Sequence, residues 1–120
     1  MGKQIITQYG LIDISKEVIA TLAGIAAMEC FGVVGMVSSR VFSDGISEIL
    51  GRDMYHKGVD VMVGKENELI IRVNVVVGYG IRMSVIAENV MERVKYTVQK
   101  FTGETVKSVD VKIQGVKIVD

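Results

Sequence analysis

Two neighbouring stretches of alternating apolar residues constrain the fold of this chain more than any other feature. Residues 59–63 read Val-Asp-Val-Met-Val, and residues 69–77 carry an apolar side chain at every odd position. Successive side chains of a β-strand point to opposite faces, so this alternation predicts strands with one buried face. Because only a short polar turn at residues 65–68 separates them, the two stretches predict an antiparallel hairpin.

Two longer segments have the spacing of amphipathic helices. Ser15 can cap the first helix, which we expect to run from residue 16 to about residue 29. The second helix is expected over about residues 81–102, and Gly103 is expected to end it.

Strand-like segments lie near both ends of the chain. One covers residues 9–14, with a backward extension through Ile5 and Ile6, and the other begins near Val106. Just before Gly115 the apolar residues stand at odd positions, and just after it they stand at even positions. This change predicts a bulge or a turn at that glycine.

The predicted order of elements is therefore β-α-β-β-α-β. The simplest packing is a two-layer α+β sandwich, in which a mostly antiparallel sheet carries two long helices on one face. A chain of 120 residues has the size of one domain, so residues 1–120 are expected to share a single core.

The segment 38–57 is unusually apolar for a connection. It could contain a short helix over residues 45–50, followed by Gly51. Its apolar side chains could complete the core or form a protein interface, and both alternatives stay open. The outer face of the sheet offers a second interface through Ile70 and Arg72. The interface candidates within the segment are Phe42, Ile46, Ile49, Leu50 and Tyr55.

The charge composition argues against a nucleic-acid-binding surface. The chain has 14 Lys and Arg residues against 14 Asp and Glu residues, whereas proteins that contact several phosphates usually carry a basic excess. Near-zero net charge also makes self-association easy. An RNA- or nucleotide-binding module is the alternative hypothesis, and it would use the basic residues Arg72, Arg82, Lys107 and Lys112.

No group of residues predicts a catalytic, metal or cofactor site. Cys30 and His56, each the only residue of its type, could form a nucleophile–base pair, but a lone cysteine after an apolar helix is usually packed. Asp60 and Asp110 could approach one another across the sheet, yet surface carboxylates are usually solvated. We therefore expect a protein without enzymatic activity, metal or cofactor.

The sequence Gly78-Tyr79-Gly80 stands between a predicted strand and a predicted helix, as the glycines of dinucleotide-binding folds do. Met83 occupies the place of the third glycine of that motif, so we interpret the glycines as a tight turn. Arg82, close to the helix N-terminus, is a candidate contact for a carboxylate or phosphate of a partner.

The chain is predicted to be cytoplasmic. Its N-terminus lacks the apolar core of a signal peptide, and its longest apolar stretch, residues 18–28, is about half of the ~20 residues that span a bilayer. A single unpaired cysteine also suits a reducing compartment. Any membrane contact would then be made through a partner, without direct insertion.

Several short motifs, which follow one another along nearly the whole chain, resemble those of a known bacterial family. They are GLIDIS-x-x-VI at 10–19, GVVGM at 32–36, KGV at 57–59, YGI at 79–81, Gly103, SVDV at 108–111 and GV at 115–116. In this order they are similar to the alkaline-shock, or envelope-stress-response, proteins of Gram-positive bacteria. The chain resembles the short, single-domain branch of that family.

This resemblance implies a non-enzymatic cytoplasmic protein in cell-envelope homeostasis or the stress response. Longer relatives assemble with themselves and reach the membrane through a small membrane-anchored partner. The resemblance therefore suggests a homo-oligomer that also binds a second, membrane-anchored protein. The family has no established catalytic residues, so none is transferred to this chain.

Overall fold

Strand β5, Leu69–Gly78, organises the main sheet because both of its edges are paired. The computed structural model of the protein describes residues 3–39 and 49–118. One edge of β5 pairs antiparallel with β4 and, further along, with β3, while the other edge pairs parallel with β6. The bounds of these strands are Val33–Met36 for β3, Val59–Val63 for β4 and Val106–Lys117 for β6.

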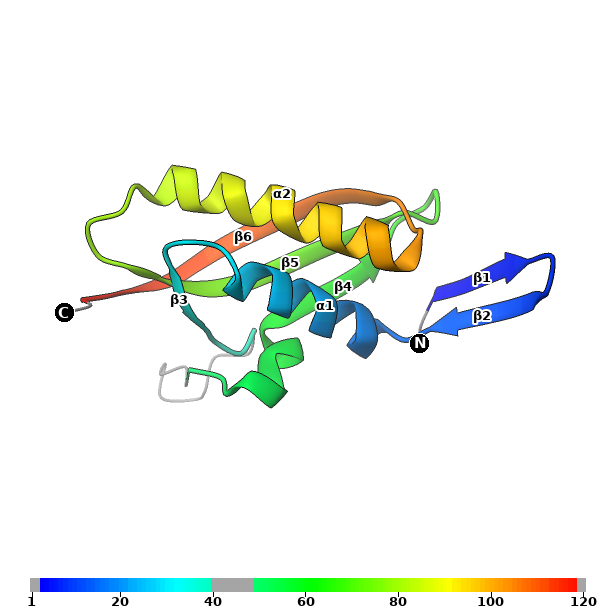
Figure 1. Ribbon diagram of the computed structural model, residues 1–120, viewed down its shortest axis with the longest axis horizontal. Coiled ribbons are helices and arrows are strands. Elements are labelled where there is room, and N and C mark those ends of the chain that lie inside the picture. The colour runs from blue at the N-terminus through cyan, green and yellow to red at the C-terminus, as the bar shows by residue number, and fades with distance from the viewer. Residues whose placement is uncertain (1–2, 40–48, 119–120) are drawn as a thin grey trace.

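Two helices cover one face of this sheet (Figure 1). Helix α1 spans Lys16–Met28, and helix α2 spans Met83–Thr102. The Ser15 hydroxyl accepts a hydrogen bond from the Val18 amide at 3.1 Å, which confirms the predicted N-cap. Gly103 follows α2 at a φ of +75°, a left-handed conformation that glycine adopts without strain. The two-layer α+β fold predicted from the sequence is thus confirmed.

The hydrophobic core lies between the helices and the inner face of the sheet. Every odd-numbered residue of β5 from 69 to 77 is fully buried, as the apolar alternation predicts. Burial of each such side chain stabilises the fold by about 1.5–3 kcal/mol. In the described part of the chain, the other large side chains that are fully buried are Ile19, Met36, Ile86, Val90, Val94, Val98 and Val106.

The pairing of β5 with β6 makes the sheet mixed. Helix α2 carries the chain back to the end of the sheet where β5 begins, so β6 runs parallel to β5. The remaining strand pairs are antiparallel. The register between β5 and β6 shifts between Ile113 and Gly115, which confirms the bulge predicted at this glycine.

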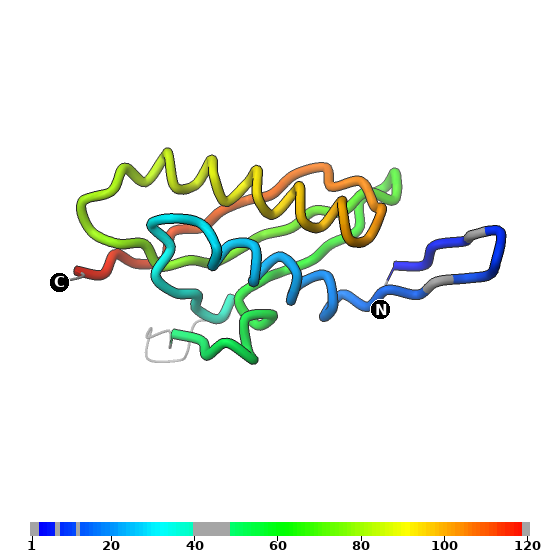
Figure 2. Tube along the Cα trace, in the orientation of Figure 1, coloured from blue at the N-terminus to red at the C-terminus, as the bar shows by residue number. Residues whose placement is uncertain are grey.

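The first predicted strand, over residues 9–14 with its backward extension, is a separate two-stranded hairpin. β1, Lys3–Thr7, pairs antiparallel with β2, Gly10–Ile14. The hairpin projects from the body near the start of α1 (Figures 1 and 2). Gly10 has a φ of +143°, and this freedom lets the chain reverse where the sequence pattern suggests one continuous strand.

The connection between β3 and β4 is only partly described. Ile49 forms an isolated antiparallel bridge beside β3, and Arg52–Gly58 form the 3₁₀-helix η1. The short helix predicted over residues 45–50 lies mostly outside the described residues. Tyr55 of η1 packs closely against α1 at Gly24. A Cβ atom added to Gly24 would lie only 2.8 Å from the Cβ atom of Tyr55, so no larger residue fits there without a shift.

Candidate interaction surface

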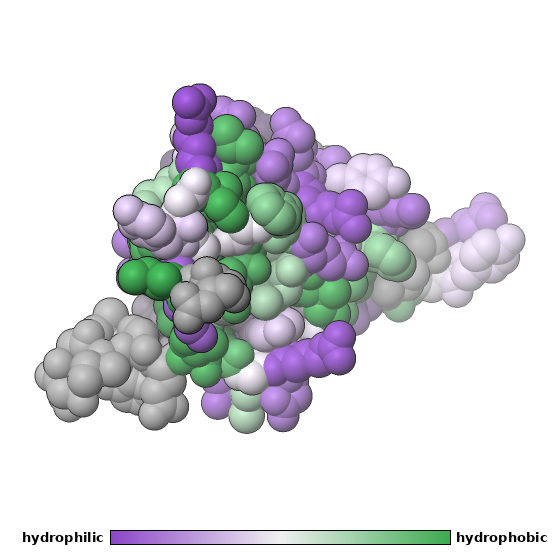
Figure 3. Space-filling model, turned by 60° about the vertical axis from the view of Figure 1, so that its left-hand side comes forward, coloured by the Kyte–Doolittle hydropathy of each residue, from purple (hydrophilic) through white to green (hydrophobic). Residues whose placement is uncertain are grey.

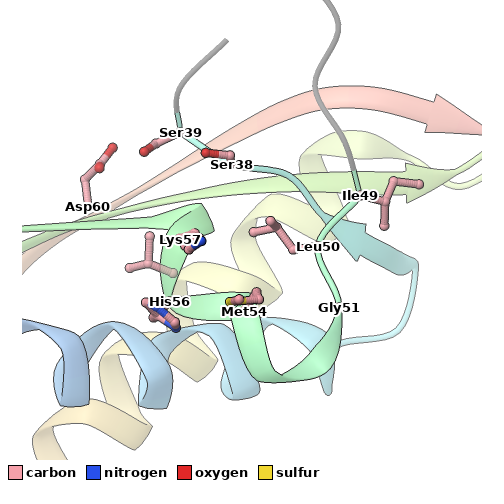
Figure 4. A pocket seen from close by; sticks show the side chains of 10 residues that line it. Ser38, Ser39, Ile49, Leu50, Gly51, Met54, His56, Lys57 and Asp60 are labelled. Atoms are coloured by element: carbon pink, nitrogen blue, oxygen red, sulfur yellow. The ribbon is translucent and has the colours of Figure 1, made fainter. Parts of the chain in front are cut away.

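A groove of about 710 Å³ lies where the chain enters β4. Its walls come from the residues after β3, from the segment 49–51, and from η1 with the start of β4. Figure 4 shows Asp60 near one end of this groove and Ile49 near the other. The groove is lined by polar and apolar side chains in comparable number, which suits a protein surface more than a small apolar ligand.

A second groove, of about 460 Å³, continues from the first, since both are lined by His56, Val59 and Asp60. The second groove extends past Met62 to the first turn of α1 on one side and to Arg72 of β5 on the other. Together the two grooves form one surface along β4, which we call the β4 groove. It comprises Ser38, Ile49, Met54, His56, Lys57, Asp60, Met62 and Arg72.

β4 is an edge strand in the part of the chain that the structure describes, where it pairs only with β5. The other edge of such a strand presents backbone N–H and C=O groups that can pair with another chain. At its far end Met62 and Val63 are 43% and 40% exposed. Addition of an extended peptide to a strand edge is a recurring mode of recognition, in which main-chain hydrogen bonds give affinity and nearby pockets give specificity.

Arg72 stands in the middle of a charged row on the outer face of the sheet. Its cross-strand partner on β4 is Asp60, and its partner on β6 is Asp110. Because Arg72 lies between them, the two carboxylates are two strand spacings apart, about 10 Å. They therefore do not form the acid–base pair that the sequence left open. Ile70, two residues before Arg72, is half-buried on the same face.

The Arg72 side chain is half-buried, and its Nε atom is buried without a hydrogen-bond partner among the described residues. A buried donor without a partner costs free energy, so a new acceptor would be favourable. A carboxylate or carbonyl oxygen of a bound protein, reached by rotation of the guanidinium, would supply one. Arginine is also among the residues enriched in protein interfaces.

The structure separates the interface candidates of the segment 38–57. Ile49 is 55% exposed in the groove, whereas Leu50 and Tyr55 are half-buried and pack against the core. Phe42 and Ile46 lie outside the described residues. This part of the chain thus contributes both to the core and to the exposed surface.

Met54, His56 and Lys57 line the groove, although none of them was among the predicted interface residues. Their placement depends on η1, which is held under α1 by the close approach of Tyr55 to Gly24. A contact between segments this far apart in the chain leaves no periodic signal in the sequence.

Cys30 and His56 lie at opposite ends of α1 and do not form a nucleophile–base pair. The His56 Nε2 atom is 4.0 Å from the Glu17 carboxylate in the first turn, whereas the Cys30 Sγ donates to the Ala26 carbonyl oxygen at 3.5 Å. The 13 residues of α1 separate the two ends by about 20 Å.

Burial raises the pKa of the Cys30 thiol, and this effect outweighs the lowering by the Arg93 guanidinium. The thiol is therefore neutral at physiological pH and packs as a small apolar group. Among the described residues, no cluster of His, Cys, Asp and Glu side chains could hold a metal ion.

The four basic residues of the RNA-binding alternative are spread over the molecule. Arg82 follows the end of β5, while Lys107 lies near its start, because Val106 pairs with Leu69. The 10 residues of β5 place these two ends about 30 Å apart. Arg82 is exposed and stays a candidate contact for an anionic group.

Lys112 is exposed on β6, opposite Asn74 of β5. Arg72 is flanked by the two aspartates of the charged row. These four positive charges therefore do not gather into one stripe of the kind that follows a phosphate backbone.

The fold and this surface define a small α+β protein with a groove beside an edge strand. The profile of the alkaline shock protein 23 family, which is described by a cell envelope-related function, matches residues 4–118. The chain therefore belongs to this family, the alkaline-shock family that its motifs resemble. None of the described helices is long and apolar enough to cross a bilayer.

Similar proteins occur in Gram-positive bacteria. The chain is 44% identical to the uncharacterized protein YloU of Bacillus subtilis, over 100% of this chain and 99% of that protein. It is 40% identical to the uncharacterized protein Spy1614 of Streptococcus pyogenes serotype M6, over 99% and 98% of the two chains. It is also 32% identical to the uncharacterized protein YqhY of Bacillus subtilis, over 92% of this chain and 80% of that protein. No solved structure matches the chain, and neither the family nor these relatives indicate an enzyme.

Proposed function

We propose that this chain is a non-enzymatic protein-interaction module, an adaptor or scaffold, that acts in cell-envelope homeostasis or the stress response and associates with itself. The observation that carries the proposal is the β4 groove, in which a strand edge, exposed apolar side chains and Arg72 lie together. Such a combination is typical of surfaces that bind proteins. The cell envelope-related function of the family supports the cellular role.

The partner at the β4 groove is an extended segment of another protein. Its main chain pairs with the edge of β4, an apolar side chain contacts Met62, and an acidic or carbonyl group accepts a hydrogen bond from Arg72. The module acts in the cytoplasm and reaches the membrane when that partner is membrane-anchored.

Affinity capture of the tagged full chain, from separated cytosolic and membrane fractions, tests this function. The wild-type chain is expected to retain a stoichiometric protein partner, and Met62→Lys is expected to lose it. A lysine at position 62 places a charge beside the exposed Val63, and lysines on edge strands oppose pairing with another strand. Met91→Lys is the matched control, since Met91 of α2 is 39% exposed and Met62 is 43% exposed.

Both substitutions replace exposed side chains, so both variants are expected to keep the circular dichroism spectrum and Tm of the wild type. Equal capture of the partner by Met62→Lys and Met91→Lys would contradict the assignment of the β4 groove. Recovery of RNA in place of protein, with binding that weakens as salt rises, would support the nucleic-acid alternative instead.

A further inference from the structure

The hairpin of β1 and β2, residues 3–14, is an arm that projects beyond the start of α1 (Figures 1 and 2). Among the described strands, β1 and β2 pair only with each other. Ile6 and Leu11 are cross-strand partners near the tip of this arm, and they are 85% and 57% exposed. An isolated two-stranded hairpin is only marginally stable in water. An arm with an exposed apolar pair therefore gains stability when it docks on another surface.

The opposite end of the molecule carries an exposed apolar surface, which we call the end patch. Two backbone hydrogen bonds join three chain segments there. The Gly78 amide donates to the Gly32 carbonyl at 2.9 Å, and the Tyr79 amide donates to the Lys117 carbonyl at 2.8 Å. Figure 3, in which this end faces forward, shows hydrophobic side chains gathered on it. The end patch consists of Phe31 (80% exposed), Tyr79 (74%) and Ile118 (74%).

The arm and the end patch lie at opposite ends of the sheet. Lys3, at the base of the arm, contacts Asn67 before β5 and Glu104 before β6. The end patch, by contrast, adjoins the last residues of β5 and β6. The longest dimension of the molecule is 52 Å. A contact between two unlike surfaces at opposite ends joins copies head to tail and not as a two-fold dimer.

We propose that the arm of one copy docks on the end patch of a second copy, so that copies assemble head to tail. The proposal rests on the self-association included in the proposed function and assigns surfaces to it. Ile6 and Leu11 of the arm cover the aromatic and aliphatic side chains of the end patch. Every copy carries both surfaces, so each docking event leaves one arm and one end patch for further copies.

Charge favours a second copy as the occupant of the end patch. The arm carries the exposed Asp13, and the end patch is bordered by the exposed Arg82 and Lys117. These opposite charges attract one another when an arm approaches the end patch. The whole chain has a formal net charge of zero, so neighbouring copies do not repel each other.

The size of the arm determines the strength expected for each contact. It consists of two strands of five residues, whereas a standard protein interface uses about 20–30 residues on each side. A single contact is therefore weak, and the extent of assembly is expected to rise steeply with protein concentration.

Sedimentation velocity of the full chain over a range of concentrations tests the proposal. The wild-type chain is expected to form species that grow beyond the dimer. The arm variant Ile6→Lys/Leu11→Lys and the patch variant Phe31→Asp/Ile118→Asp are each expected to stay monomeric alone. An equimolar mixture of the two should form dimers and nothing larger, because only one intact arm and one intact end patch meet in each pair.

Three results would overturn the proposal. One is a patch variant that still dimerises alone, as an exchange between two arms would allow. Another is a wild-type chain that stays monomeric at every concentration. The third is a mixture of the two variants that stays monomeric although the wild type assembles. All variants replace exposed side chains, and an unchanged circular dichroism spectrum shows that they fold.

The Met62→Lys variant distinguishes failure of this proposal from failure of the proposed function. It is expected to assemble like the wild type while it loses the partner at the β4 groove. A different result would be a wild-type chain that stays monomeric and captures another protein, which the arm variant no longer captures. That result would assign the arm to the other protein and would overturn head-to-tail assembly.

Discussion

Asn74 shows how one buried polar side chain connects the sheet to the β4 groove. It lies on the outer face of β5 and is only 2% exposed. Its Nδ2 atom donates to the Gly58 carbonyl oxygen at 3.0 Å, and its Oδ1 atom accepts from the Gln114 Nε2 atom at 2.8 Å. Gly58 is the last residue of η1, directly before β4. Asn74 therefore holds the wall of the groove against the centre of the sheet.

Replacing Asn74 by alanine is expected to lower the free energy of unfolding by about 1–3 kcal/mol, because the Gly58 carbonyl loses its buried partner. Urea unfolding measures this change. Gln114→Ala is the matched control, since Gln114 is exposed and water can replace its amide. A loss of stability for Asn74→Ala no larger than for Gln114→Ala would contradict this role.

The residue scale also shows what sequence alternation can predict. The alternation places Asn74 on the outer face of its strand, and that placement is confirmed. Its burial could not be predicted, because it depends on Gly58 and Gln114, which other elements bring beside it. In the same way, the alternation predicts Arg72 on the outer face, but not the aspartates on both sides of it.

At the scale of elements, the arm is held to the body by Lys3. This side chain is 5% exposed, forms an ion pair with Glu104 at 2.6 Å, and donates to the Asn67 carbonyl oxygen. A buried ion pair adds little net stability, but removal of one partner leaves the other charge buried and uncompensated.

Lys3→Met is therefore expected to lower the free energy of unfolding by about 3–5 kcal/mol, or to release the base of the arm. Urea unfolding and hydrogen exchange of the amides of residues 3–14 distinguish these two effects. The double variant Lys3→Met/Glu104→Gln should recover part of the loss, because neither charge is then buried alone. The role of this ion pair would be contradicted if the loss of unfolding free energy in the double variant equalled the sum of the losses in the two single variants.

The sequence predicts the bounds of the two long helices closely, but it does not predict the short elements. Helix α1 begins at the predicted residue, and α2 begins two residues later than expected because Arg82 takes the N-cap position. Periodicity over three or more turns, with a glycine stop, carries this information locally.

Two strands of the fold, β3 and β1, depend on contacts with residues outside their own segments. Strand β3 has four residues, and its conformation depends on pairing with β5. Strand β1 pairs with β2 through a turn before Gly10, although the pattern suggests one continuous strand. Local sequence cannot specify such pairings, because apolar strand residues pair equally well with several partners.

The sequence could predict the exposure of the candidate interface residues only in part. Ile49, Ile70 and Arg72 lie on or beside the accessible outer surface, whereas Leu50 and Tyr55 pack against the core. An apolar residue in a connection has the same appearance in the sequence whether it faces solvent or the core. Only the position of η1 under α1 separates the two cases.

On the scale of the whole molecule, the three proposed surfaces do not overlap. The β4 groove runs beside an edge strand, and the arm and the end patch lie at the two ends of the long axis. Copies joined head to tail would present a row of β4 grooves. A row of weak sites binds a clustered partner more tightly than a single site does, because the later binding events are intramolecular.

Site-specific photo-crosslinking in living cells tests whether a protein partner binds at the β4 groove. A photoreactive amino acid replaces Met62 in one strain and Met91, of similar exposure, in another. A discrete crosslinked protein is expected from position 62 and none from position 91. Equal crosslinking from both positions, or crosslinks to nucleic acid alone, would contradict binding of a protein partner at this groove.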